Sequence, residues 1–112
     1  MLPSSVRLRK KQDFERVYQS GKTTRSTLFR LTVAAHPTNG LRIGVVVSNN
    51  TCKSAVTRNR KKRQMRAALQ QLLPLLTPGY DIILTAQPPV LTAPYAAMKK
   101  DLHSLLNKAT LL

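Results

Sequence analysis

Acidic residues are scarce in this sequence. Only four occur, Asp13, Glu15, Asp81 and Asp101, against 19 lysines and arginines, so the 112 residues carry a formal net charge of +15. The long stretch between Glu15 and Asp81 contains none. A charge excess of this size indicates a polyanionic partner, and nucleic acid is the first candidate.

Cysteine and long apolar runs are scarce as well. The single cysteine, Cys52, excludes an intrachain disulfide and a cysteine-rich zinc site, fits a reducing compartment, and is expected to be an ordinary packing residue. No apolar run approaches the ~20 residues that span a bilayer, and the opening MLPSSVRLRKK lacks the apolar segment of a signal peptide. We therefore expect a cytoplasmic protein with no membrane partner and no obligate protein partner.

Candidate catalytic groups are equally few. Besides the four acids, the chain has only two histidines, His36 and His103, and these residues do not show the spacing of a metal-ligand set or of an acid–base pair. We expect both histidines at the surface or at the rim of the core. The sequence thus predicts no catalytic residue and no metal site in the protein itself.

Hydrophobic periodicity predicts a single α+β domain over residues 1–112, a usual single-domain length, with 42% hydrophobic residues. Amphipathic helices are expected at about 10–20, 53–73 and 95–106, and strands at 22–26, 26–36, 41–48 and 80–86. The turn at 37–40 predicts an antiparallel hairpin between the strands that flank it. We expect a sandwich of helices packed on one sheet, with residues 1–10 as a flexible basic arm.

The segment AVTRNRKKRQMRAAL, residues 55–69, reads as a helix with cations nearly all round its first half. At 100° per residue, Arg58, Lys62 and Arg66 fall in one row. The apolar residues on the adjoining face are Met65, Ala68, Leu69 and Leu72. A helix face with both acidic and basic residues would favour simple exposure to solvent. Here all the charged residues are basic, which favours contact with nucleic acid, and arginine in particular can bind phosphate oxygens through two parallel hydrogen bonds. Membrane-surface binding is the weaker alternative, since the basic half lacks a continuous apolar face.

Three stretches together resemble the bacterial ribonuclease P protein component. SAVTRNRKKRQMRAAL is similar to the family signature of an Ala-Val pair followed by Arg-Asn-Arg, Lys-Arg and a further Arg. RLRKKQDFERVYQSGK resembles its N-terminal pattern of a basic stretch, an Asp-Phe pair, an aromatic four residues later, and a glycine before the first strand. RIGVVVS and GYDIILTA resemble the strands on either side of the basic helix, so the resemblance covers most of the chain.

The resemblance implies the protein subunit of a ribozyme. The family binds a large catalytic RNA, and the complex removes the 5′ leader of precursor tRNA by magnesium-dependent endonucleolytic hydrolysis. The implied fold is an αβββαβα sandwich with a left-handed βαβ crossover, a hand that topology statistics alone would not predict. Magnesium is then bound mainly by the RNA, and the protein alone is inactive. A structural RNA-binding protein, such as a ribosomal protein, is the alternative.

Residue roles follow from the same resemblance. The residues implied to face the catalytic RNA are Arg58, Asn59, Arg60, Lys61, Lys62, Arg63 and Arg66. Phe14 and Tyr18 would line a cleft between the sheet and the basic helix, where the leader lies. Ordinary core packing with Val17 explains both aromatics as well. Arg30 and Lys53 are implied as basic neighbours of the leader.

Two departures from the family pattern remove a cation near the expected leader path. Gln87 stands where relatives often have an arginine, and Asn49 or Asn50 stands where many have a lysine. Leader affinity would then be lower, or leader binding would depend on Lys53 and Arg30.

Overall fold

The structure is a computed structural model that describes residues 4–38 and 40–112. Its helices and strands follow the predicted αβββαβα order: α1 (Lys11–Ser20), β1 (Lys22–Arg25), β2 (Phe29–Ala35), β3 (Leu41–Val46), α2 (Ala55–Leu72), β4 (Tyr80–Ala86) and α3 (Tyr95–Lys108). Three short 3₁₀ turns accompany them: η1 (Ser4–Val6), η2 (Leu73–Leu75) and η3 (Pro88–Thr92). Among the described residues, none of the helices has both the length and the apolarity needed to cross a membrane.

The four strands form one mixed sheet in the order β1-β2-β4-β3. β2 is antiparallel to β1 and to β4, whereas β3 runs parallel to β4. The prediction of a hairpin between β2 and β3 is therefore wrong, because β4 lies between them. Asp81, Ile82, Ile83 and Leu84 of β4 are all 0% exposed. Because Ile82, Ile83 and Leu84 are apolar and point to alternate faces, β4 is stabilised at the centre of a sheet that is covered on both faces, and the less buried β3 takes an edge.

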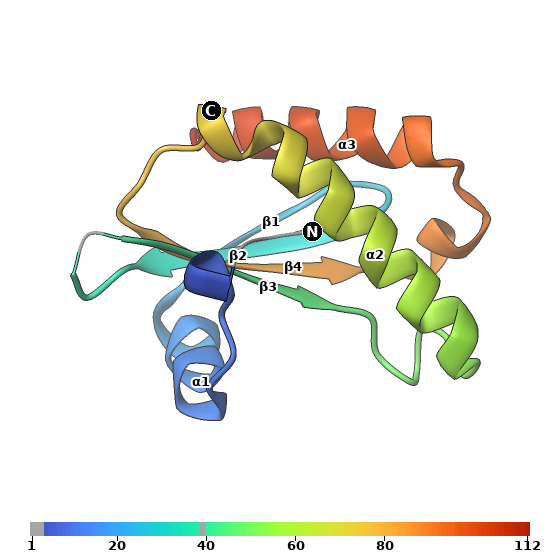
Figure 1. Cartoon of the computed structure of the whole chain (residues 1–112), viewed down its shortest axis with the longest axis horizontal. Coiled ribbons are helices and arrows are strands. Elements are labelled where there is room, and N and C mark those ends of the chain that lie inside the picture. The colour runs from blue at the N-terminus through green and yellow to red at the C-terminus, as the bar shows by residue number, and fades with distance from the viewer. Residues whose placement is uncertain (1–3, 39) are drawn as a thin grey trace.

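Helices cover both faces of the sheet. α2 and α3 lie on one face, and α1 lies on the opposite face (Figure 1). In this view β3 lies in front of β4 and α2 passes above the sheet, so the path from β3 through α2 to β4 is left-handed, as the family resemblance implies. The N-terminal half of α2 and the C-terminal end of α3 point to opposite sides of the molecule (Figure 1).

Alternation along the strands divides the core between the two faces. Ile82 and Leu84 pack with residues of α2 and α3 such as Leu69, whereas Ile83 packs with Val17 of α1. Both faces of the central strands are therefore apolar, and the two layers of helices are held to the same sheet.

The end of the expected N-terminal arm is docked along β3. Leu8 is only 5% exposed, its backbone N–H donates to Ile43 O at 2.9 Å, and Arg7 forms a parallel bridge with Ile43. Residues 1–3 of that arm lie outside the described residues. The docked segment brings further positive charge to the exposed edge of the sheet.

Candidate nucleic-acid interface

α2 has a capped start and a buried stripe along one side. Ser54 Oγ accepts a hydrogen bond from Thr57 N at 3.3 Å, which satisfies one of the N–H groups left open at a helix start. The buried stripe consists of Lys61, Met65, Ala68, Leu69 and Leu72. The apolar face predicted from the sequence is thereby confirmed, and it fixes which side of α2 points outward.

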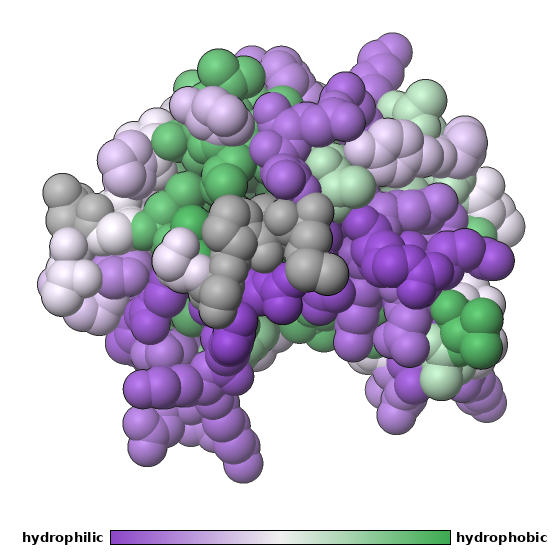
Figure 2. Space-filling view, in the orientation of Figure 1, coloured by the Kyte–Doolittle hydropathy of each residue, from purple (hydrophilic) through white to green (hydrophobic). Residues whose placement is uncertain are grey.

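The outward side of α2 carries most of the signature residues. Asn59, Arg60 and Arg63 are exposed, and Lys62 and Arg66 are half-buried. No carboxylate in the described part of the chain forms an ion pair with this helix. Figure 2 shows hydrophilic side chains gathered over α2. The positive charge of α2 is therefore not balanced by the protein's own acids.

Arg58 has a role within the protein. Its Nη1 donates to the carbonyl oxygens of Cys52 and Lys53, at 3.0 and 3.1 Å, and so ties the preceding loop to the first turns of α2. Cys52 is buried, in agreement with the expected packing role. Arg58 therefore positions the start of the helix in addition to presenting positive charge there.

Lys61 is buried, which corrects its place among the RNA-facing cations. The residue is 5% exposed, and its Nζ donates to Ala93 O at 3.0 Å. Burial, and to a smaller extent the charge of Arg60, lowers the pKa of Lys61 below its ordinary value. Lys61 precedes Met65 by four residues and so lies on the same side of the helix. This spacing could have revealed its burial from the sequence.

The aromatic pair Phe14 and Tyr18 lies on α1, across the sheet from α2 (Figure 1). The expected cleft between the sheet and the basic helix is therefore wrong: these rings belong to the opposite face, because α1 packs there. Tyr18 is 47% exposed, and its ring centroid is 6.4 Å from that of Phe14. Phe14 packs closely on β3, since a Cβ added to Gly44 would lie 2.5 Å from its ring. Phe14 is thus partly a core residue, whereas Tyr18 offers its ring to the outside.

A pocket of about 400 Å³ opens beside Tyr18 on this face. Its lining consists of Tyr18, Arg30, Val46, Ser48, Thr51, Thr85, Ala86, Gln87 and Pro88, a set of described residues without a carboxylate. Arg30 thus lies with Tyr18, whereas Lys53 is exposed in the loop before α2 and is not part of the lining. Sequence reasoning missed Thr85, which pairs with Arg30 across β2 and β4, because strand register is not visible in a single sequence.

Gln87 is turned toward the protein's own backbone. Its Nε2 donates to Ser26 O at 2.6 Å and to Phe29 O at 2.8 Å. The side chain therefore secures the start of β2 and supplies no charge to the pocket.

A smaller pocket of about 180 Å³ lies at the β3 edge, between the two faces. Phe14 from α1 and Arg66 from α2 both line it, together with Arg7, Arg9 and residues of β3. Arg7 and Arg9 are positively charged residues that the sequence analysis assigned only to the arm. A polyanion passing over this edge would stay beside positive charge from α2 to the Tyr18 pocket.

Two of the four acidic residues, Asp81 and Asp13, are held by arginines within the fold. Asp81 is fully buried and accepts hydrogen bonds from Arg16 and, at 2.8 and 2.9 Å, from Arg42, which also donates to Asp13 at 3.1 Å. The hydrogen bonds and charge of Asp81, and then those of Asp13, raise the pKa of Arg42 against the opposing effect of burial. His36 lies at the rim of this cluster, with Nε2 3.8 Å from Asp81. Within residues 4–38 and 40–112, no three His, Cys, Asp or Glu side chains form a potential metal-binding group.

Comparison with known proteins identifies the family. A family model described as Ribonuclease P matches residues 2–110. The ribonuclease P protein component of Pseudanabaena sp. is 42% identical, over 100% of this chain and 97% of that protein, and that of Chloroflexus aurantiacus is 44% identical, over 96% and 80%. A solved structure of the Staphylococcus aureus RNase P protein matches with a TM-score of 0.86 at 25% identity, over 95% of this chain and 96% of that one. The chain therefore belongs to the family of bacterial ribonuclease P protein components.

Proposed function

We propose that this chain is the protein subunit of a cytoplasmic ribonuclease P. In this role it binds the catalytic RNA through α2 and the 5′ leader of precursor tRNA through the pocket beside Tyr18. The observation that carries the proposal is the outward side of α2, where a run of cations without a protein counter-ion is held on a buried stripe. Arg60 and Arg63 can each bind phosphate oxygens through two hydrogen bonds, and Asn59 adds a donor and an acceptor for a sugar or base. Membership of the family does not favour a ribosomal role.

The pocket beside Tyr18 suits a single-stranded leader. The exposed ring of Tyr18 offers a surface on which a base can stack, worth roughly 1–3 kcal/mol per base and with little dependence on base sequence. Arg30 supplies positive charge in the same pocket. Lys53 lies exposed between the pocket residue Thr51 and the start of α2, where it can attract a passing phosphate.

The proposal assigns the chemistry to the RNA. Hydrolysis of a phosphodiester needs an activated water and stabilisation of the leaving oxygen, which protein nucleases commonly achieve with carboxylate-held metal ions. Among the described residues the acids do not gather into a group that could hold magnesium, and three of the four are engaged: Asp13 and Asp81 are bound by arginine, and Asp101 accepts a hydrogen bond from Ser26 at 2.5 Å. Phosphates of the RNA would then hold the magnesium. The protein's cations reduce repulsion between the two RNAs, so that less magnesium is needed.

Reconstitution tests the proposed role. The purified protein, added to a bacterial ribonuclease P RNA at low magnesium, should produce cleavage of precursor tRNA that neither component produces alone. Cleavage by the protein without RNA, or a rate at low magnesium that the protein does not change, would contradict the proposal.

A triple variant of the acidic residues tests whether the chemistry resides in the RNA. Asp13→Asn, Glu15→Gln and Asp101→Asn are combined, and Asp81 is kept because its loss would leave two arginines without their buried partner. Turnover of the reconstituted complex at saturating magnesium should survive. If the variant folded and bound the RNA but showed no turnover, the catalytic groups would belong to the protein and the proposal would be wrong.

A further inference from the structure

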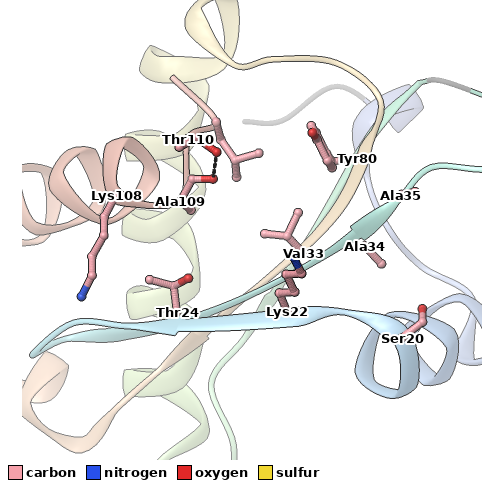
Figure 3. Close-up of a pocket in the computed structure, with 11 residues that line it drawn as sticks. Ser20, Lys22, Thr24, Val33, Ala34, Ala35, Tyr80, Lys108, Ala109 and Thr110 are labelled. Atoms are coloured by element: carbon pink, nitrogen blue, oxygen red, sulfur yellow. Dashed lines mark hydrogen bonds between the residues drawn. The ribbon is translucent and has the colours of Figure 1, made fainter.

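A third pocket, of about 490 Å³, lies beneath the C-terminal end of α3 (Figure 3). This volume is within the range of sites that bind small ligands. Its lining consists of Ser20, Lys22, Thr24, Val33, Ala34, Ala35, Tyr80, Lys108, Ala109, Thr110 and Leu111. The pocket lies at the end of β2 that is farther from Arg30, and it shares no residue with the pocket beside Tyr18. The proposed contacts with catalytic RNA and leader leave it unused.

Strand register gives this α3-end pocket an apolar floor with a cation at its edge. Lys22 pairs with Val33, and Ala35 pairs with Tyr80, so each pair points to one face of the sheet. Val33 and Tyr80 pack against the core cluster that contains α2 and α3. Figure 3 shows Lys22 beside Val33 on this face. A ligand entering here would meet apolar side chains below it and an ammonium group beside it.

The end of α3 forms the opposite wall, and several of its carbonyl groups already accept hydrogen bonds, that of Ala109 from Thr110 Oγ1 at 2.6 Å. Thr110 has a φ of 60°, which turns the chain so that Leu111 returns to the core at 2% exposure. The backbone N–H groups of Ala109, Thr110 and Leu111 each donate at 3.0 Å to a carbonyl near the helix end. These bonds reduce the negative potential of the helix end, and Lys108 in the last turn opposes it further. The negative potential of this wall is therefore partly compensated.

The polar groups of the pocket are cationic or hydroxylic. Its cations are Lys22 and Lys108, and its hydroxyl groups belong to Ser20, Thr24, Tyr80 and Thr110. The hydroxyls of Ser20 and Thr110 already donate to backbone carbonyl groups, at 2.7 and 2.6 Å, and so are left as acceptors for a sugar hydroxyl. No carboxylate is found among the described residues of the lining. A ligand that matches this set carries a negative charge, several hydrogen-bonding groups and a flat apolar part. A nucleotide has all three: the phosphate suits the lysines, the sugar suits the hydroxyl groups, and the base suits the floor at Val33.

We propose that the α3-end pocket binds one unpaired nucleotide of an RNA chain. The site is a second RNA contact, away from the N-terminal half of α2 and at the opposite end of β2 from the Tyr18 pocket, and it rests on the proposed role of this chain as an RNA-binding subunit. Lys22 and Lys108 come from different elements that line the pocket, so an RNA backbone that runs between them can turn one unstacked base inward. The net charge of +15 favours a polyanion over a small free anion as the source of that nucleotide.

NMR titration of the full-length protein tests the site directly. The probes are a short single-stranded oligoribonucleotide, adenosine monophosphate and inorganic phosphate. The oligoribonucleotide should shift the amide signals of Ala35, Ala109 and Thr110, and the monophosphate should shift them at higher concentration. If inorganic phosphate shifts them as strongly as the nucleotide, or if the oligoribonucleotide moves only signals of α2 and the Tyr18 pocket, the proposal is wrong.

Matched variants separate the pocket from general electrostatic attraction. Lys22→Ala with Lys108→Ala and the control Lys99→Ala with Lys100→Ala each remove two positive charges, but only the first pair lines the pocket. The first variant should lose the amide shifts and reduce the slope of log K against log salt by about 1.4, at about 0.7 for each single-strand phosphate contact. The control should keep the shifts. Equal behaviour of the two variants would overturn the proposal.

A third variant blocks the floor without changing charge. Ala35→Phe should fill part of the pocket and remove the shifts of Ala109 and Thr110, while circular dichroism reports an intact fold. A folded variant that still shows these shifts would refute the nucleotide site. Because this titration needs no catalytic RNA, its failure is distinct from a failure of reconstituted cleavage, which would instead contradict the proposed function.

Discussion

Replacing Arg60 and Arg63 together by alanine should weaken RNA binding and leave the fold unchanged. Both side chains are exposed on the outward side of α2, and neither takes part in a hydrogen bond or ion pair among the described residues. Substitution of such surface residues usually changes the free energy of unfolding by less than about 0.5 kcal/mol. Arg58 is left in place because it holds the carbonyl groups of Cys52 and Lys53.

The size of the effect follows from counterion release. Each phosphate contact contributes about −0.7 to −0.9 to the slope of log K against log salt. Loss of two contacts reduces the slope by about 1.4 to 1.8, so between about 50 and about 200 mM salt the wild-type affinity should fall about 7- to 12-fold more than that of the variant. The wild-type protein should bind more tightly at every salt concentration, with the largest advantage at low salt.

The assay is a filter-binding or fluorescence titration of a ribonuclease P RNA at several salt concentrations. Lys99→Ala with Lys100→Ala is a suitable control, since it removes the same charge from α3. An unchanged slope in the Arg60 and Arg63 variant, or the same loss in the control, would refute contact through α2. A markedly lower melting temperature would instead make these arginines structural.

Three further predictions concern other parts of the molecule. Phe14→Ala and Tyr18→Ala should each weaken binding of precursor tRNA to the reconstituted complex more than binding of mature tRNA, with Tyr18→Ala leaving stability nearly unchanged; equal losses for both tRNAs would exclude leader stacking. Asp81→Asn should lower the free energy of unfolding by about 3 kcal/mol because Arg16 and Arg42 lose their buried partner, whereas Asp13→Asn should cost less than about 1 kcal/mol in a denaturant titration. The pKa of Lys61 is lowered in the folded state, so just below the ordinary value of 10.5 the unfolded chain binds more protons than the folded protein. The free energy of unfolding of the wild-type protein should therefore rise as the pH approaches that value, and Lys61→Met should lack this rise. Parallel plots of unfolding free energy against pH for the two proteins would contradict this.

The elements of the fold could be predicted from the sequence because each has a clear local period. The apolar side of α2, for example, follows from the spacing of Met65, Ala68, Leu69 and Leu72. The position of β4 between β2 and β3 could not be predicted, since a turn such as 37–40 indicates a reversal of the chain and not which strand becomes the neighbour. That choice depends on the burial of β4 on both faces, which is a property of the whole domain.

The candidate site was predictable where charge and helical spacing determine exposure. Arg60 and Arg63 are exposed as the run of cations indicates, and Lys61 is the exception that the four-residue spacing to Met65 explains. The side of the sheet on which Tyr18 lies was not predictable, because it depends on the face against which α1 packs. The α3-end pocket was also not predictable, since its lining joins residues that are distant in the sequence.

The unbalanced charge on α2 leads to a last prediction, that multivalent anions stabilise the fold itself. Arg58 and Lys62, and likewise Lys62 and Arg66, are four residues apart on one helix, and each such like-charge pair costs a few tenths of a kcal/mol. An anion bound between these side chains removes the repulsion and binds only the folded state. At 100 times its dissociation constant it adds about 2.7 kcal/mol, which for a domain of this size raises the melting temperature by about 10 °C. Millimolar pyrophosphate should therefore raise the midpoint of thermal unfolding, and sodium chloride of equal ionic strength should not. Lys62→Ala, which removes the cation shared by both pairs, should lose much of this rise. If sodium chloride stabilised the protein as well as pyrophosphate, general screening would explain the effect, and α2 would not need a bound polyanion to be fully stable.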